Sequence, residues 1–192
     1  MLAFLITFAR LPLAGAFAVI VAVQAGRPSV PAAWAIALFG VAACEELSDL
    51  LDGMVARKTG TASPLGGILD PLADSLARLT MYFAMALAGW ITIAVPLAMT
   101  ARDIVVAYTR IVQALTGGKT SARTSGKLKA FVQGAGIFII IILGLAAGQA
   151  RLDPNLLQVL RGGIAALIIA VTSWSLLDYI RGAGPGIRLL RR

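Results

Sequence analysis

Apolar residues run along the chain in six long blocks, and short polar or Gly- and Pro-containing stretches separate the blocks. The blocks lie near residues 4–23, 30–57, 65–89, 91–115, 131–150 and 156–180. Blocks of this length and hydrophobicity are typical of membrane-spanning helices. Small residues (Ala, Gly and Ser) occur in all six, as expected where helices pack closely inside a membrane. The pattern predicts an all-α, polytopic membrane protein with six transmembrane helices, built as a single domain over residues 1–192.

Composition and charge agree with this prediction. Hydrophobic residues make up 59% of the 192 residues and the mean hydropathy is +0.88, which excludes a soluble domain. The formal net charge of +8 does not indicate nucleic-acid binding, because the Lys and Arg residues cluster near the ends of apolar blocks. The positive-inside rule and lipid headgroups account for that distribution. It favours a protein of the cell (inner) membrane with both chain ends in the cytoplasm.

Acidic residues are concentrated in one region of the chain. Six of the nine lie there: Glu45, Glu46, Asp49, Asp52, Asp70 and Asp74. A charge at membrane depth is costly, so carboxylates within apolar blocks indicate a functional site. The chain contains no histidine and a single cysteine, Cys44, which excludes histidine-based acid–base or zinc chemistry and an internal disulfide. Carboxylates must therefore carry the chemistry.

The spacing of four aspartates predicts a site for divalent metal ions. Asp49 and Asp52 share one face of a helix, and Asp70 and Asp74 share a face of the next helix. Residues 58–64 between them are rich in Thr, Ser, Gly and Pro, which predicts a turn. Four facing carboxylates stay ionised in an apolar environment only with bound cations, and carboxylate oxygens suit Mg2+ or Mn2+. We expect two such ions, as is usual for phosphoryl transfer, in a polar cavity near the cytoplasmic side.

The same residues resemble the signature of a known family. The pattern D-x2-D-G-x2-A-R-x8-G-x3-D-x3-D, from Asp49 to Asp74, is similar to that of the CDP-alcohol phosphotransferases. These are membrane enzymes that move a phosphatidyl or phospho-alcohol group from a CDP-linked donor to an alcohol. The resemblance implies a CDP-diacylglycerol donor, a homodimer, and Asp74 as the general base that takes the proton of the acceptor hydroxyl. It also implies a set of donor-binding residues: Gly53, Arg57, Gly66 and, as weaker candidates, Ser63 and Thr7.

Basic residues in the fourth block and after it predict the acceptor. The A-R-D of residues 101–103, Arg110, and the G-K-L-K of residues 126–129 are similar to a pattern of the phosphatidylglycerolphosphate synthases within that family. Several cations at one helix–loop junction form a pocket for a phosphate, which favours glycerol 3-phosphate. Asp103 and Ala130 replace the Glu and Thr of that pattern, so inositol phosphate and serine remain alternative acceptors. The residues expected to hold the acceptor phosphate are Arg110, Lys127 and Lys129.

Two other classes of function stay open at this point. A divalent-metal transporter would also place carboxylates in a membrane, although such folds are expected to contain internal repeats and the motif has no second copy. A purely structural ion network would use the carboxylates only to pair with arginines. Glu45 and Glu46 are expected to pair with buried arginines such as Arg78 or Arg102 in preference to binding metal. Arg78 is expected to be a counter-charge to the acidic residues.

Overall fold

The computed structural model describes residues 2–59, 66–115 and 124–189, with side chains described for residues 10–48, 71–111, 113 and 124–182. The described chain is all-helical, as the sequence predicts, and contains no strand in these segments. Its helices are α1 (Leu2–Val23), α2 (Ala32–Thr59), α3 (Gly66–Leu87), α4 (Ala94–Leu115), α5 (Thr124–Gly148) and α6 (Pro154–Leu189).

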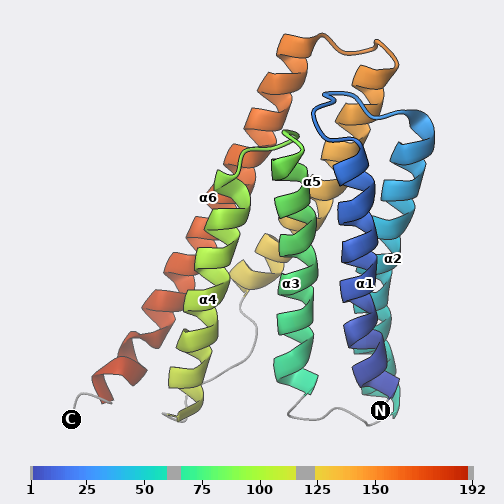
Figure 1. Ribbon diagram of the computed structural model, residues 1–192. Coiled ribbons are helices and arrows are strands. Elements are labelled where there is room, and N and C mark those ends of the chain that lie inside the picture. The colour runs from blue at the N-terminus through green and yellow to red at the C-terminus, as the bar shows by residue number, and fades with distance from the viewer. Residues whose placement is uncertain (1, 60–65, 116–123, 190–192) are drawn as a thin grey trace.

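The six helices lie side by side as a bundle (Figure 1). The first helix, α1, packs against both α2 and α3, while α6 packs against α4 and α5. Contacts of α5 with α2 and α3, and of α3 with α4, join these two groups. The start of α1 and the end of α6 lie at the same end of the bundle, as expected for an even number of helices that run alternately up and down.

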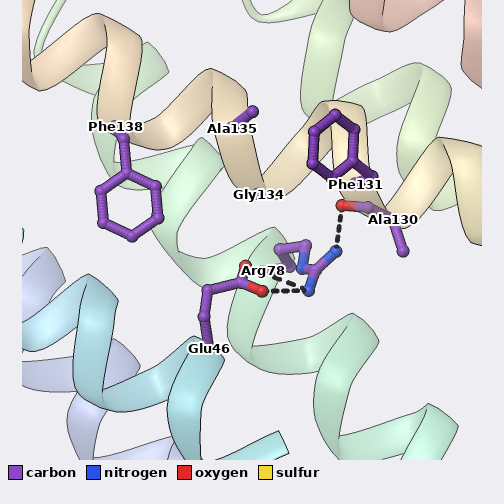
Figure 2. A pocket seen from close by; sticks show the side chains of 7 residues that line it. All are labelled: Glu46, Arg78, Ala130, Phe131, Gly134, Ala135 and Phe138. Atoms are coloured by element: carbon purple, nitrogen blue, oxygen red, sulfur yellow. Dashed lines mark hydrogen bonds and ion pairs between the residues drawn. The ribbon is translucent and has the colours of Figure 1, made fainter. Parts of the chain in front are cut away.

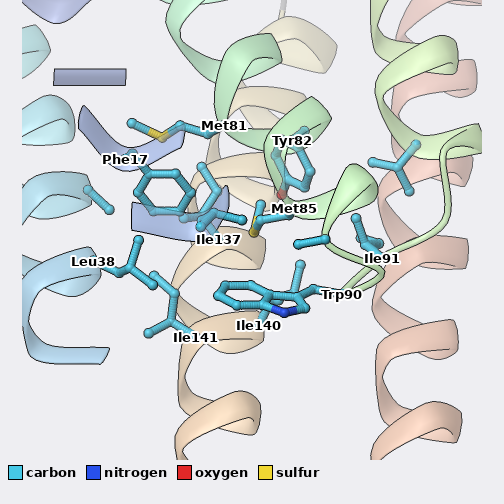
Figure 3. Packing of buried hydrophobic residues seen from close by; sticks show 14 of the residues in the cluster. Phe17, Leu38, Met81, Tyr82, Met85, Trp90, Ile91, Ile137, Ile140 and Ile141 are labelled. Carbon is cyan, nitrogen blue, oxygen red and sulfur yellow. The ribbon is translucent and has the colours of Figure 1, made fainter. Parts of the chain in front are cut away.

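A cluster of buried apolar side chains fills the centre of the bundle. Figure 3 shows Phe17 from α1, Met81 and Met85 from α3, and Ile137 and Ile140 from α5 within it. All five side chains are buried. Close packing of this kind leaves little room for volume changes, so the cluster fixes how α1, α3 and α5 lie relative to one another.

Loop residues 24–31, between α1 and α2, close one end of the bundle. The Val30 amide donates to the Gly144 carbonyl of α5 at 2.9 Å, and the Trp90 indole donates to the Arg27 carbonyl at 3.0 Å. The Arg161 guanidinium of α6 donates to the Pro28 carbonyl at 3.1 Å. We call this end of the bundle, where the connection between α5 and α6 also lies (Figure 1), the closed end. These contacts satisfy loop carbonyls and an amide that would otherwise lack partners.

Two helices of the described chain have the length and composition of a membrane span. In the described chain, Thr124–Gly148 and Pro154–Gly182 are long and apolar enough to cross a membrane, and Arg10–Val23 is a shorter apolar stretch. The helices α2, α3 and α4 carry charged residues near their middles, such as Glu45, Arg78 and Arg102. These charges interrupt the apolar runs, and six spans are therefore not established by length and composition alone.

Three helix boundaries differ from the expected ones. The predicted turn at 58–64 begins later, because α2 continues to Thr59. The fifth helix begins at Thr124 instead of residue 131, so Lys127 and Lys129 are helical and not in a loop. The sixth apolar block ends near residue 180, where several glycines follow, but the sixth helix continues to Leu189. Glycine lowers helix propensity by only about 1 kcal/mol per residue, which a continuing helix can offset.

Candidate functional site

The two halves of the aspartate motif lie on consecutive helices. Backbone positions on α2 and α3 are described for six motif residues, whose side chains lie outside the described set: Asp49, Asp52, Gly53, Arg57, Gly66 and Asp70. The backbone of Thr7 lies on α1, and its side chain is likewise not among those described. Ser63 lies outside the described residues. Asp74 is thus the motif carboxylate whose contacts can be followed directly.

Arg78 links both halves of the motif through its contacts. Its Nη2 atom lies 3.1 Å from Glu46 Oε1 on α2 and 3.2 Å from Asp74 Oδ1 on its own helix. Its Nη1 atom donates to the Ala130 carbonyl of α5 at 2.8 Å (Figure 2). Arg78 is therefore a counter-charge to the acidic residues, as predicted.

The Glu46–Arg78 ion pair brings the two motif helices together. Glu46 precedes Asp49 by three residues on α2, and Arg78 follows Asp74 by four residues on α3. Each partner is thus about one helical turn from a motif aspartate on its own helix. The ion pair therefore joins α2 to α3 one turn away from the aspartates, which confirms the expected pairing of Glu46 with Arg78.

Glu45 behaves differently from Glu46. Its side chain is 1% exposed, and neither of its carboxylate oxygens accepts a hydrogen bond from a described residue. Among the described side chains, the predicted pairing of Glu45 with a buried arginine is thus not formed, and Arg102 instead pairs with Asp103 at 2.8 Å. Asp74 Oδ1, by contrast, is ion-paired with Arg78 at 3.2 Å. The buried Glu45 oxygens without donors among the described residues are the kind of group that fits a cation site.

A pocket of about 390 Å³ lies beside Arg78. Figure 2 shows its polar side, formed by Glu46 and Arg78, and the rings of Phe131 and Phe138 from α5. The remaining lining residues are Ala130, Gly134 and Ala135. Gly134 leaves room for the Glu46 carboxylate in this arrangement, because a Cβ atom there would lie 2.7 Å from Glu46 Oε1. The pocket therefore combines a charged side with an apolar wall.

A second group of charges joins α4 to α5. Lys129 Nζ lies 3.0 Å and 3.3 Å from the two carboxylate oxygens of Asp103, and Arg102 donates to the same carboxylate at 2.8 Å. Lys129 is 6% exposed, whereas Lys127 is exposed to the surroundings. Of the residues expected to bind the acceptor phosphate, Lys129 is thus already paired with an aspartate.

Arg110 lies against α6 and forms no ion pair with the described residues. Its Nη2 atom donates to the Tyr179 hydroxyl at 3.2 Å, and its guanidinium carbon lies 5.6 Å from the centroid of the Tyr179 ring. No residue of the sixth apolar block was among the expected site residues, so this contact was not predicted.

The polar residues of α6 that face the charges share one helix face. Ser175 accepts a hydrogen bond from Arg102 at 2.9 Å, and Thr172 accepts one from Gln133 at 3.0 Å. Thr172, Ser175 and Tyr179 are spaced by three and four residues, and all are buried. This spacing of polar residues within an apolar helix is a signal that could have located them.

Comparison with known proteins decides the family. A model of the CDP-alcohol phosphatidyltransferase family matches residues 1–177. The chain belongs to this family. Its match covers the aspartate motif, Arg78 and the cluster of Arg102, Asp103 and Lys129.

Relatives within the family agree with the assignment. The chain is 31% identical over 166 residues to a CDP-diacylglycerol–glycerol-3-phosphate 3-phosphatidyltransferase of Salmonella typhimurium, covering 80% of this chain and 82% of that protein. It is 28% identical over 170 residues to a probable phosphatidylglycerophosphate synthase of Mycobacterium tuberculosis, covering 84% and 78%. A further enzyme, of the same name as the Salmonella protein and from Treponema pallidum, is 31% identical over 113 residues. The match covers 58% of this chain and 51% of the Treponema protein, about half its length.

Divalent metal ions are general to the CDP-alcohol phosphatidyltransferase family. Among the described side chains no group of three or more Asp, Glu, His or Cys residues could hold a metal. Three of the four motif aspartates lie outside that set, so the described part of the site consists of Asp74 and the carboxylates near it. The buried Glu45 oxygens, which accept no hydrogen bond from the described residues, are compatible with a cation. The family and the two apolar helices of this chain indicate a membrane-associated protein.

Proposed function

We propose that the protein transfers the phosphatidyl group of CDP-diacylglycerol to glycerol 3-phosphate and releases CMP, as a step of phospholipid biosynthesis. The observation that carries this proposal is the Glu46–Arg78 ion pair, which joins the two motif helices next to Asp74. The names of the Salmonella and Treponema relatives support the choice of donor and acceptor. Serine or inositol phosphate in place of glycerol 3-phosphate is the alternative within the same chemistry.

The aspartates of the motif are proposed to hold the metal. Asp49, Asp52, Asp70 and Asp74 would bind two Mg2+ or Mn2+ ions, which would neutralise charge on the pyrophosphate of the donor. Both buried oxygens of Glu45, which accept no hydrogen bond from the described residues, support a cation in this region.

Proton transfer is assigned to Asp74. Its carboxylate takes the proton of the acceptor hydroxyl as that oxygen forms a bond to the phosphorus nearest the lipid. The bond from the same phosphorus to the oxygen of CMP breaks, and CMP leaves with the electron pair. Arg78, at 3.2 Å, holds Asp74 in place on the side towards α2. The residues proposed to bind the donor are Gly53, Arg57, Gly66, Ser63 and Thr7.

The acceptor phosphate is proposed to bind near Arg110, Lys127 and Lys129. Lys129 shares Asp103 with Arg102, so two cations there are balanced by one carboxylate. Arg110 forms no ion pair with the described residues. An excess of positive charge in a partly buried position favours a phosphate over a neutral acceptor.

All six helices are proposed to span the cell (inner) membrane, with the motif on the cytoplasmic side. Large apolar side chains are exposed on every helix, among them Val19, Ile36, Leu76, Leu97, Ile142 and Val159. A surface of this kind favours contact with lipid over contact with water. The common end of α1 and α6 supports an even number of spans. We further propose that the chain is one domain and forms a homodimer, which light scattering in detergent would test.

CMP release by the purified protein tests the proposed function. The protein in detergent with CDP-diacylglycerol, glycerol 3-phosphate and Mg2+ or Mn2+ should release CMP, and EDTA should stop the release. Parallel assays with serine, inositol phosphate and glycerol would identify the acceptor. If none of these alcohols supports CMP release, while liposomes with the protein conduct Mn2+ without nucleotide, the metal-transporter alternative holds instead.

A further inference from the structure

Tyr179 lies between two arginines of α4. Its side chain is 1% exposed. The guanidinium carbon of Arg102 lies 5.1 Å from the ring centroid and that of Arg110 lies 5.6 Å from it, distances at which a cation is attracted to an aromatic face. The Tyr179 hydroxyl also accepts a hydrogen bond from Arg110 at 3.2 Å. Tyr179 therefore fixes two cations that would otherwise repel each other.

The two arginines differ in how their charge is balanced. Arg102 pairs with Asp103 and donates to Ser175. Arg110 forms no ion pair with the described residues, and its described partner is the neutral Tyr179. A carboxylate against Arg110 would hold the guanidinium but would also neutralise it. An aromatic ring with a hydroxyl holds the guanidinium while leaving its charge available to an anion.

Gly126 of α5 connects this contact to the G-K-L-K segment of residues 126–129. A Cβ atom at Gly126 would lie 3.0 Å from the Tyr179 hydroxyl and 3.5 Å from Arg102 Nη2. The ring atom Cε2 of Tyr179 would lie at 3.5 Å, an ordinary contact distance. The absence of a side chain at residue 126 is thus needed mainly by the hydroxyl of Tyr179.

We propose that Tyr179 is a positioning residue that holds Arg110 in the acceptor site, so that Arg110 meets the acceptor phosphate with an unneutralised charge. The inference rests on the proposed function and adds α6 to the site. Tyr179 contributes to binding of the acceptor and not of the lipid donor. Removing Tyr179 should therefore raise the KM for glycerol 3-phosphate and leave the KM for CDP-diacylglycerol unchanged.

Steady-state kinetics of matched tyrosine variants test this proposal. Tyr179→Phe keeps the ring and should raise the KM for glycerol 3-phosphate about threefold, the effect of one weak hydrogen bond. Tyr179→Leu removes ring and hydroxyl and should raise it about 30-fold or more. Tyr108 on α4 is 68% exposed, so Tyr108→Phe and Tyr108→Leu are the matched controls and should leave both KM values within about twofold, as is usual for surface substitutions.

A double-mutant cycle keeps the test independent of folding of the leucine variant. Gly126→Ala should raise the KM for glycerol 3-phosphate by displacing the Tyr179 hydroxyl, and it should have a smaller effect in a Tyr179→Phe background, where that hydroxyl is absent. Equal effects in both backgrounds would contradict the contact.

The outcomes separate this inference from the function on which it rests. Wild-type protein that releases no CMP with glycerol 3-phosphate would remove the proposed function and this inference together. Active wild-type protein whose acceptor KM is the same in the Tyr179 and Tyr108 variants would remove the inference alone. A parallel rise in the KM values of donor and acceptor would assign Tyr179 a merely structural role.

Discussion

Different kinds of contact stabilise the closed end and the region of the ion pairs formed by Glu46, Arg78, Asp103 and Lys129, which we call the charged part. At the closed end, each hydrogen bond has a main-chain carbonyl as its acceptor: Val30 donates to the Gly144 carbonyl, while Trp90 and Arg161 donate to carbonyls of the loop. In the charged part, side chains meet side chains, as in the Glu46–Arg78 and Asp103–Lys129 ion pairs. Contacts to the backbone thus hold one end of the bundle, and ion pairs join the helices nearer their middles.

This difference separates stability from chemistry. A main-chain contact between a loop and a helix cannot be replaced by a ligand, and it serves packing only. An ion pair between long side chains can exchange its partner for a phosphate or a metal ion at modest cost. Substitutions at the closed end should therefore change the free energy of unfolding, whereas substitutions in the charged part should change activity, and four predictions test that separation.

The largest effect is expected at Asp74. Asp74→Asn removes the proposed base and a metal-binding oxygen, and CMP release should fall by about 10³-fold, within the range for loss of a general base. The matched control is Asp153→Asn at the closed end, where Asp153 Oδ1 accepts from the amides of Asn155 and Leu156. Asparagine caps a helix as well as aspartate does, so this control should keep full activity. Equal activities of the two variants would refute the assignment of Asp74.

Substitution of Arg78 should change both the free energy of unfolding and the activity. Arg78→Met removes one cation from Glu46 and Asp74 and one donor from the Ala130 carbonyl. Breaking a buried ion pair costs about 3–5 kcal/mol, so thermal unfolding in detergent should begin at a clearly lower temperature, and CMP release should be lost. The control Arg151→Met removes an exposed cation at the closed end and should change neither. An Arg78→Met protein with wild-type stability would contradict the linking role of Arg78.

Gly148 should affect stability alone. A Cβ atom there would lie 2.8 Å from the Val30 carbonyl oxygen, a main-chain atom that cannot rotate away. Gly148→Ala should lower the free energy of unfolding by about 1–3 kcal/mol, as overpacking does, while kcat per folded molecule stays unchanged. Gly162→Ala on α6, with nothing within 4 Å of the added atom, should instead be neutral or slightly stabilising. A loss of kcat in Gly148→Ala would show that the two regions are coupled.

Gly134 should give the smallest effect. A Cβ atom there would lie 2.7 Å from Glu46 Oε1, at the end of a flexible side chain that can move. Gly134→Ala should therefore cost less than about 1 kcal/mol in stability, yet it should weaken the ion pair of Glu46 with Arg78 and reduce CMP release a few-fold. A chemical denaturation curve and the CMP assay, measured together, check both parts. A variant that loses several kcal/mol and no activity would reverse the expected order.

The positions of the six helices could be predicted well from the sequence, and the ends of the helices less well. Apolar blocks of 20 or so residues leave few alternatives to helix, and every predicted block overlaps one helix of the bundle. The start of α5 was misplaced because Lys127 and Lys129 look like loop residues when read by polarity, while in the fold Lys129 is buried against Asp103 on α4. The end of α6 was misplaced because the apolar block stops before the glycines that follow residue 181, and glycine disfavours a helix only weakly.

The charged contacts could be predicted only in part. That Arg78 would face the acidic residues followed from its position one turn after Asp74 on the same helix. That Glu46 and not Glu45 is its partner depends on the rotation of α2 relative to α3, which one sequence does not contain. The same holds for Tyr179, which is far from Arg110 along the chain and next to it in space.

The amino-acid sequence alone was enough to predict the family and the kind of chemistry. Hydrophobicity favours helices in a membrane, and four aspartates at fixed spacing in apolar surroundings predict bound cations, because both expectations follow from local solvation. Which charges neutralise each other, and which remain available, depends on the tertiary structure. Pairing depends on distances of a few ångströms between different helices, and it leaves Lys129 bound to Asp103 while Arg110 rests on a neutral ring.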